Sequence, residues 1–239
     1  AMVIPEVLSD NATRSVRTGN RYTGMNTVTH TATDANVSRM WSQMYQIITN
    51  TNAIIANEAT IKKIATSLEQ EEAAQLVGEA YAVRALVYFD LMKFFARPLK
   101  FTTDGSHLGV PLVIKPIVNI TEVVYPARNT AAEVYAQIDK DLTAAIALLP
   151  QTGNVISNGV VNNTLFKIRM NRFSTLALKA RVSVYKSDWA SAADAANQVI
   201  ASGRYALYTF GNMLQDFRTQ NSAESIFEIA NNTNDNPGV

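Results

Sequence analysis

The sequence contains no cysteine, which excludes disulfide bonds, thiolate metal sites and cysteine nucleophiles. Its only two histidines are His30 and His107, and neither has a partner at metal-ligand spacing, so we expect no metal and no cofactor. There is no glycine-rich phosphate loop, no dinucleotide fingerprint and no nucleophile elbow. Ser183 and Lys186 match the S-x-x-K pattern of serine acyl-enzymes, but this serine lies at the end of a predicted helix instead of its beginning. We therefore do not expect an enzyme.

The chain also lacks a strong charge of either sign and a long apolar run. Lysine and arginine number 21 against 20 acidic residues, a net charge of +1, and no basic stripe is present. A nucleic acid would need clustered basic residues to neutralise its phosphates, so we do not expect one as partner. No apolar stretch is long enough to span a bilayer. A content of 47% hydrophobic and 17% charged residues is typical of a globular chain, here large enough for a row of stacked helix pairs.

The most apolar segment runs from Ala80 to Phe95 and predicts a buried central helix. Its apolar positions surround the helix axis, whereas a helix at the surface would keep one polar face. Arg84 lies on the most apolar stripe, so its guanidinium needs a carboxylate or several carbonyl groups as partners. Arg97 and Pro98 end this helix, and 109–113 is predicted to be extended because Pro111 lacks an N–H donor.

The segment from Leu176 to Tyr208 predicts two antiparallel helices joined by a tight turn. Apolar residues recur in it at steps of three and four, and small alanines let the two helices approach closely. The turn residues Lys186, Ser187 and Asp188 are predicted to supply a cap, and Gly203 is predicted to end the second helix. Trp189, like Trp41 earlier in the chain, falls on an apolar stripe and is predicted to be in the core. The pair resembles a tetratricopeptide unit.

The rest of the chain predicts further helices separated by long loops. Helices are expected at about 35–57 (capped by Asp34), at 60–68, from about 69 and after Thr130, with irregular connections at 99–125 and 151–164. The predicted fold is all-α: tetratricopeptide-like stacked helix pairs in a right-handed α-α superhelix with long irregular loops.

Several motifs, in this order, resemble those of the SusD/RagB family of outer-membrane glycan-binding lipoproteins. The matching residues are Trp41, Tyr45, Ile48 and Asn52 (W-x3-Y-x2-I-x3-N); Glu79, Arg84, Tyr88 and Phe89 (E-x4-R-x3-YF); 109–113 (GVPLV); the 128–150 run with EVY, DL and LLP; and a strand-like segment at 225–229. No single motif is specific, but together they extend over nearly the whole chain.

The resemblance implies a fold and a role. It implies that residues 1–239 form a single SusD-like N-terminal helical domain, a fragment of a longer protein, because family members continue for about as long again. The intact protein is then expected on the cell surface, held at the outer membrane through an N-terminal lipid anchor that is absent from this chain. It would capture an oligosaccharide or polysaccharide and deliver it to a SusC-like TonB-dependent transporter, without making or breaking a bond.

A glycan site usually combines an exposed aromatic ring with polar side chains that bind hydroxyl groups. The polar segment before the Trp41 helix offers such groups, and in the resembled family loops at this position contribute to the glycan site. The candidate ligand-binding residues are Arg17, Asn20, Arg21, Tyr22, Asn26 and His30. The alternative for this segment is a solvated loop in which Tyr22 packs on a neighbour.

The competing function is a tetratricopeptide-type scaffold that binds a protein or peptide. Such scaffolds have short, regular linkers between their helices. The linkers at 99–125 and 151–164 are long and irregular, which favours ligand-binding loops on a helical frame.

Overall fold

The computed structural model describes residues 3–9, 22–64, 69–117, 119, 121, 125–162 and 164–230. The chain divides into two compact units, residues 1–47 and residues 48–239, and each is described by itself. The single domain expected over residues 1–239 stays a prediction.

The first unit contains helices α1 (Val3–Leu8) and α2 (Thr23–Asn26) and the beginning of α3 (Ala35–Ala56). The start of α3 is fixed by Asp34, as predicted: its carboxylate accepts a hydrogen bond of 2.8 Å from the Asn36 amide. On the first turns of α3, Trp41 is half-buried and lies against Tyr45, with 4.8 Å between the ring centroids. Trp41 is therefore less deeply buried than the sequence predicted.

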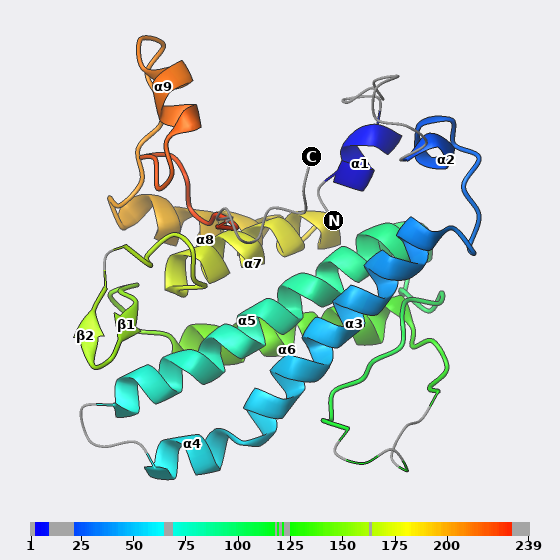
Figure 1. The fold of residues 1–239 in the computed structure, drawn as a ribbon, viewed down its shortest axis with the longest axis horizontal. Helices are drawn as coiled ribbons and strands as arrows, with labels where there is room; N and C mark the ends of the chain where they lie inside the picture. Colours follow the sequence, from blue (N-terminus) through cyan, green and yellow to red (C-terminus); the bar gives the residue numbers. More distant parts are fainter. Residues whose placement is uncertain are drawn as a thin grey trace. The chain divides into compact units, whose positions relative to one another are not determined.

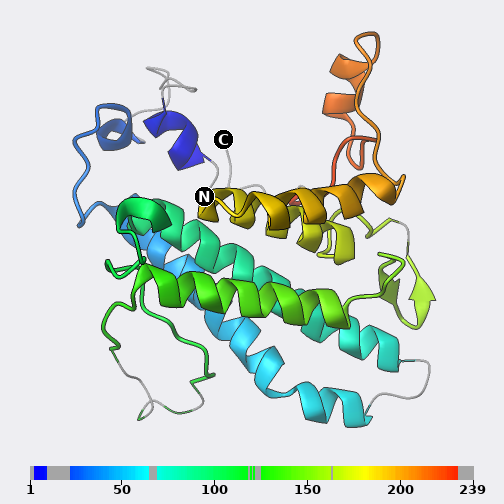
Figure 2. The ribbon, with the colours of Figure 1, turned by 180° about the vertical axis from the view of Figure 1, so that it is seen from behind.

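The second unit is built from helices, with one small hairpin among the described residues. Its helices are α4 (Glu58–Ile64), α5 (Gln70–Phe95), the 3-10 helix η2 (Leu99–Phe101), α6 (Ala131–Leu148), α7 (Arg172–Lys186), α8 (Trp189–Ala201) and α9 (Met213–Arg218). Helices α5 and α6 lie side by side and antiparallel, and α7 and α8 form a second such pair (Figures 1 and 2). The predicted all-α, tetratricopeptide-like stacking of helix pairs is confirmed.

Helix α5 is the centre of this unit. Buried residues lie on every side of it, among them Val77, Ala82, Tyr88 and Leu91, as its lack of a polar face predicted. Gly78 allows the end of α6 to approach closely, because a Cβ atom there would lie 3.0 Å from the Leu149 side chain. The helix therefore provides the surface on which the neighbouring elements pack.

Helix α6 begins at the predicted cap. Thr130 Oγ1 accepts from the Glu133 amide at 3.2 Å, and the Glu133 carboxylate accepts from the Thr130 amide at 2.8 Å. This reciprocal capping box satisfies two amides that the helix leaves without partners. The bond from the Thr130 backbone is the main reason why the pKa of Glu133 lies below its usual value.

A β-hairpin lies in the connection that the sequence predicted to be irregular. Strands β1 (Ile156–Ser157) and β2 (Val160–Val161) pair antiparallel. The Gln75 side chain of α5 binds β1 as a neighbouring strand would: its amide donates to the Ile156 carbonyl at 3.2 Å and accepts from the Ile156 N–H at 2.8 Å. Strands of two residues are too short to produce an alternating pattern, so they could not be predicted from the sequence.

A partly buried ion pair fixes the segment that follows the hairpin. Arg169 donates two hydrogen bonds to the Glu79 carboxylate on α5, at 2.8 and 3.0 Å. Burial nevertheless raises the pKa of Glu79 above its ordinary value, although the Arg169 guanidinium opposes this shift. A raised carboxyl pKa stabilises the fold below the ordinary pKa, and this contribution is lost as the pH rises through the folded-state pKa.

The α7–α8 turn has the predicted caps but buries a different face. Asp188 accepts from the Ser191 amide at 3.1 Å, and Gly203, with φ +65°, follows the end of α8. The buried residues of α8 are Ala192, Ala195 and Val199, and the last two pack with Leu176 on α7. The prediction that Trp189 is in the core was wrong: it is 65% exposed, because this stripe of small residues is rotated away from it.

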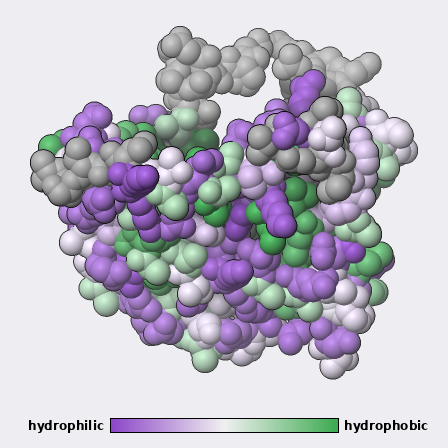
Figure 3. Space-filling model, turned by 90° about the horizontal axis from the view of Figure 1, so that it is seen from below, coloured by the Kyte–Doolittle hydropathy of each residue, from purple (hydrophilic) through white to green (hydrophobic). Residues whose placement is uncertain are grey.

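Figure 3 shows hydrophilic and apolar residues intermixed on the face that it displays. The segment after α8 exposes several large apolar side chains. Leu207, Phe210, Leu214 and Phe217 are all highly exposed. The strand-like segment expected at 225–229 is not a strand; the Glu228 amide donates to the Lys167 carbonyl at 2.8 Å instead. Within the described part of the chain, no helix has the length and apolar character needed to cross a membrane.

Gly153 lies in the connection that follows α6, and it offers a test of how tightly this connection packs against α7. It has φ +71°, and a Cβ atom there would lie 2.4 Å from the Phe173 ring, whereas Gly159 has φ +73° and open space. We expect Gly159→Ala to cost about 1–2 kcal/mol from backbone strain alone. Gly153→Ala should cost about 1–3 kcal/mol more, because the Phe173 ring must move. Urea unfolding of the two variants measures the difference, and equal losses would contradict the close contact.

Candidate functional site

The buried Arg84 on α5 lies at the centre of a polar network. Its Nε and Nη2 donate to the two carboxylate oxygens of Asp141 on α6, at 2.8 and 2.6 Å. Its Nη1 donates to Asn52 Oδ1 on α3, at 2.7 Å. Gln137 adds a bond of 2.8 Å to Asp141. The carboxylate partner predicted for Arg84 is thus present, and the planar fork of the guanidinium fixes three helices relative to one another.

The same network holds the extended segment 109–113 against the helices. The Asn52 amide donates to the carbonyls of Val113 and Lys115, at 2.8 and 3.3 Å. The Tyr88 hydroxyl donates to the Val113 carbonyl at 2.9 Å and accepts from the Val113 N–H at 2.8 Å. Burial raises the pKa of Tyr88 to about 12, so this hydroxyl keeps the proton that the first bond requires. Tyr88 therefore pairs with both backbone groups of Val113, and Asn52 adds a second bond to the Val113 carbonyl.

Further bonds close the base of the long loop that begins after α5. Asn129 Oδ1 accepts from the Leu112 N–H at 2.9 Å, and its carbonyl accepts from Gly109 at 2.7 Å. The Arg128 guanidinium donates to the carbonyls of Gly109 and Leu108, at 2.6 and 3.0 Å. The loop is thus held at both ends, although it contains no regular structure longer than η2 among its described residues.

The beginning of this loop presents an aromatic and cationic group that we call the loop platform: Arg97, Phe101 and His107. Phe101 is 57% exposed; the Arg97 guanidinium lies over its face, 4.7 Å from the centroid, and the His107 ring meets its edge at 5.4 Å. The Arg97 carbonyl can only accept, so His107 Nε2 donates to it at 3.2 Å, and Nδ1 then accepts from the Thr102 hydroxyl at 2.9 Å. Exposed aromatic rings with hydrogen-bond donors beside them suit a sugar ligand.

The ligand-binding residues predicted from the sequence lie in the first unit or outside the described residues. Arg17, Asn20 and Arg21 are outside. Tyr22, Asn26 and His30 share one tight turn around α2: the Asn26 amide donates to the Tyr22 carbonyl at 2.9 Å, and the His30 amide donates to Gly24 at 3.1 Å. All three side chains are half-buried. The structure thus places these three close along the chain, and their role in binding stays a prediction.

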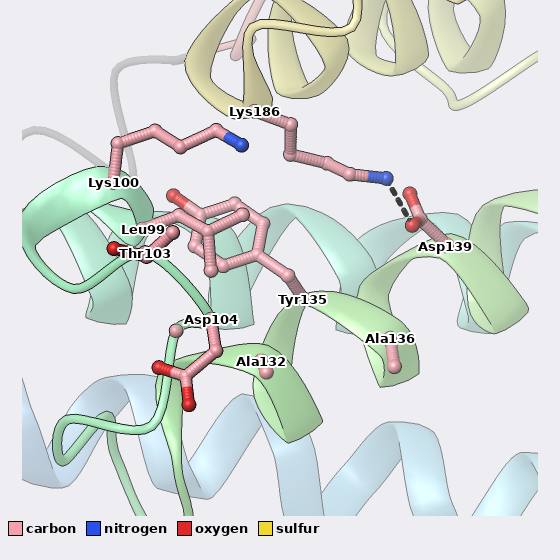
Figure 4. A pocket seen from close by; sticks show the side chains of 10 residues that line it. Leu99, Lys100, Thr103, Asp104, Ala132, Tyr135, Ala136, Asp139 and Lys186 are labelled. Atoms are coloured by element: carbon pink, nitrogen blue, oxygen red, sulfur yellow. Dashed lines mark hydrogen bonds and ion pairs between the residues drawn. The ribbon is translucent and has the colours of Figure 1, made fainter.

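A pocket of about 240 Å³ lies beside the loop platform, between η2, α6 and the end of α7 (Figure 4). Its polar lining comes from Lys100, Thr103 and Asp104 of the loop, Tyr135 and Asp139 of α6, and Lys186 of α7. The Lys186 ammonium pairs with the Asp139 carboxylate. This ion pair engages the lysine of the S-x-x-K match, while Ser183 is buried in α7.

A second, apolar groove of about 460 Å³ is lined by residues 112–117 and Pro126. It lies on the segment that Asn52 and Tyr88 hold in place. Among the described residues no group of three or more histidines, cysteines or carboxylates could hold a metal ion.

The family can now be stated. A family model described as "Starch-binding associating with outer membrane" matches residues 2–183, which is most of the chain. The chain belongs to the SusD-like family. The resemblance found in the sequence motifs is thereby confirmed.

Individual relatives agree with this assignment. SusD-like protein P38 of Formosa agariphila is 27% identical over 169 residues, which cover 71% of this chain and 27% of that protein. A SusD superfamily protein from Bacteroides vulgatus is 31% identical with a TM-score of 0.75, covering 90% of this chain and 46% of that one. One from Bacteroides thetaiotaomicron is 28% identical with a TM-score of 0.77, covering 92% and 45%. The chain thus spans less than half the length of these relatives.

The family motifs coincide with the buried network. Asn52, Arg84, Tyr88, Asp141 and the 109–113 segment were recognised as motif positions, and the structure joins them by hydrogen bonds. The loop platform was missed. Phe101 stands alone in a loop without periodicity, so only the folded backbone brings Arg97 and His107 to its ring.

Two aspartates on α6 test the importance of the buried ion pair. Asp141→Asn removes the charge opposite Arg84 in a fully buried site, so we expect it to lower the free energy of unfolding by about 3–5 kcal/mol. Asp139→Asn breaks the pair with Lys186, in which the Asp139 side chain is 41% exposed, and should cost about 1 kcal/mol or less. Urea unfolding distinguishes the two, and similar losses would show that the Arg84 pair is not special.

Proposed function

We propose that the protein captures oligosaccharides or polysaccharides at the cell surface and delivers them to a SusC-like TonB-dependent transporter, without cleaving them. The proposal is supported first by membership of a family described as starch-binding and associating with the outer membrane. It is supported second by the loop platform, which combines an exposed aromatic ring with an arginine side chain.

Binding would use stacking and hydrogen bonds. A sugar ring has an apolar C–H face that packs on aromatic side chains such as Phe101 and the 95% exposed Tyr125. Its hydroxyl groups accept hydrogen bonds from the Arg97 guanidinium, whose fixed fork of donors loses little freedom on binding. Because the base of the loop is already closed by Tyr88 and Asn129, little ordering of that base is needed when a ligand binds.

The early segment of the first unit is a further ligand-binding segment in this proposal, considered by itself. Tyr22, Asn26 and His30 are held in a turn by backbone bonds, and Arg17, Asn20 and Arg21 precede them in the chain. We propose that this segment contributes an aromatic ring and amide groups to the ligand. The lipid anchor at the outer membrane and the contact with the transporter also belong to the proposal, as properties of the full-length protein.

The test is calorimetric titration of the full-length protein with a panel of neutral and acidic oligosaccharides. We expect at least one to bind, and Phe101→Ala and Tyr22→Ala each to weaken binding about five- to tenfold, because each removes an aromatic contact. Phe210→Ala removes a more exposed aromatic ring outside both segments and should leave the affinity unchanged.

Two results would contradict the proposal. If no glycan binds while a peptide or protein copurifies, the tetratricopeptide-type scaffold is favoured instead. If a glycan is hydrolysed during the titration, the protein is an enzyme.

A further inference from the structure

The pocket beside the loop platform is lined by two lysines, Lys100 and Lys186, and by two aspartates, Asp104 and Asp139. In Figure 4 the Lys100 side chain extends across the pocket toward Lys186, while Lys186 is joined to Asp139. The charges of Lys186 and Asp139 therefore offset each other. No carboxylate forms an ion pair with Lys100 in the part of the chain that the structure describes.

The remaining acid of the pocket is turned elsewhere. Asp104 lies on the other side of Leu99 and Thr103 from the Lys100 side chain in this view (Figure 4). Its carboxylate accepts a hydrogen bond of 3.0 Å from the Ser106 amide, which keeps it in its own turn. The Lys100 ammonium is thus the cation of the pocket lining that the structure leaves without an ion pair.

The other surfaces of the pocket suit a sugar ring. Ala132, Ala136 and Leu99 provide small or apolar walls, and Thr103 adds a hydroxyl group. Tyr135 is buried beneath them. The turn at Gly105 is packed tightly on η2 and α6, since a Cβ atom there would lie 2.8 Å from the Leu99 side chain and 3.1 Å from the Ala132 side chain, so these walls are fixed. A volume of about 240 Å³ is below the roughly 300–1,000 Å³ of pockets for drug-sized ligands, and fits one ring better than several.

We propose that this pocket binds an acidic sugar, with its carboxylate or sulfate group at the Lys100 ammonium and its ring against Leu99, Ala132 and Ala136. The inference rests on the proposed glycan-binding function and deepens it, because it names the class of glycan. Lys100 and Phe101 are neighbours in η2, so one chain is able to place an acidic ring in the pocket and another ring on the loop platform.

Paired ligands that differ only in charge test this inference in the full-length protein. The carboxylate pair is trigalacturonate and its methyl ester, and the sulfate pair is a carrageenan tetrasaccharide and its desulfated form. We expect the charged member of at least one pair to bind about fivefold or more tightly than its neutral counterpart. Lys100→Met should abolish that difference, and Lys140→Met, which removes an exposed lysine elsewhere on α6, should not.

Each outcome has a separate meaning. The pair that shows the preference identifies carboxylate or sulfate as the bound group. If both members of each pair bind equally, if only neutral glycans bind, or if Lys100→Met keeps the preference, the inference is wrong while the proposed function stands. If no glycan of any kind binds, the proposed function itself fails, and this inference with it.

Discussion

The structure depends on one buried guanidinium. Arg84 is a buried residue of α5, the central helix, and an unpaired charge at this position would cost several kcal/mol. Asp141 and Asn52 occupy its donors, so α3, α5 and α6 are restricted to the arrangement that brings both partners within 2.6–2.8 Å. A buried ion pair of this kind adds little net stability over apolar packing, but it penalises any arrangement that separates the partners.

The three helices joined by Arg84 form the frame that fixes the position of the long loop after α5. Asn52 binds Arg84 through its oxygen and the Val113 and Lys115 carbonyls through its nitrogen, so the same amide that completes the network also holds the loop. Tyr88, one turn after Arg84 on α5, forms hydrogen bonds with both the N–H and the carbonyl of Val113. A long irregular loop is thereby given a fixed base, which is what a binding surface built on loops requires.

The sequence predicted the helices with periodic apolar residues and the partners that buried groups need. It missed the features that depend on contacts between residues far apart in the fold. The central helix, the Thr130 and Asp188 caps and the demand of Arg84 for a carboxylate all follow from local pattern or from burial. The sequence did not predict that Asp141 would be this carboxylate: Asp139 and Asp141 were both expected on a solvated face, whereas Asp141 is fully buried opposite Arg84. Trp189 was wrongly predicted in the core, because α8 packs through a stripe of mostly small residues and leaves the larger tryptophan exposed. The loop platform could not be predicted, because Arg97 and His107 reach the Phe101 ring only through the folded path of the loop.

Hydrogen exchange at the loop base tests the central claim most directly. In Tyr88→Phe the Val113 N–H and carbonyl lose their hydroxyl partner, while the Arg84 network remains intact. The account predicts faster exchange of the amides at 109–113, with those of α7 and α8 unchanged, and no such change in Tyr185→Phe, which removes a hydroxyl from a half-exposed ring. Unchanged exchange at 109–113 in Tyr88→Phe would show that the frame does not hold the loop.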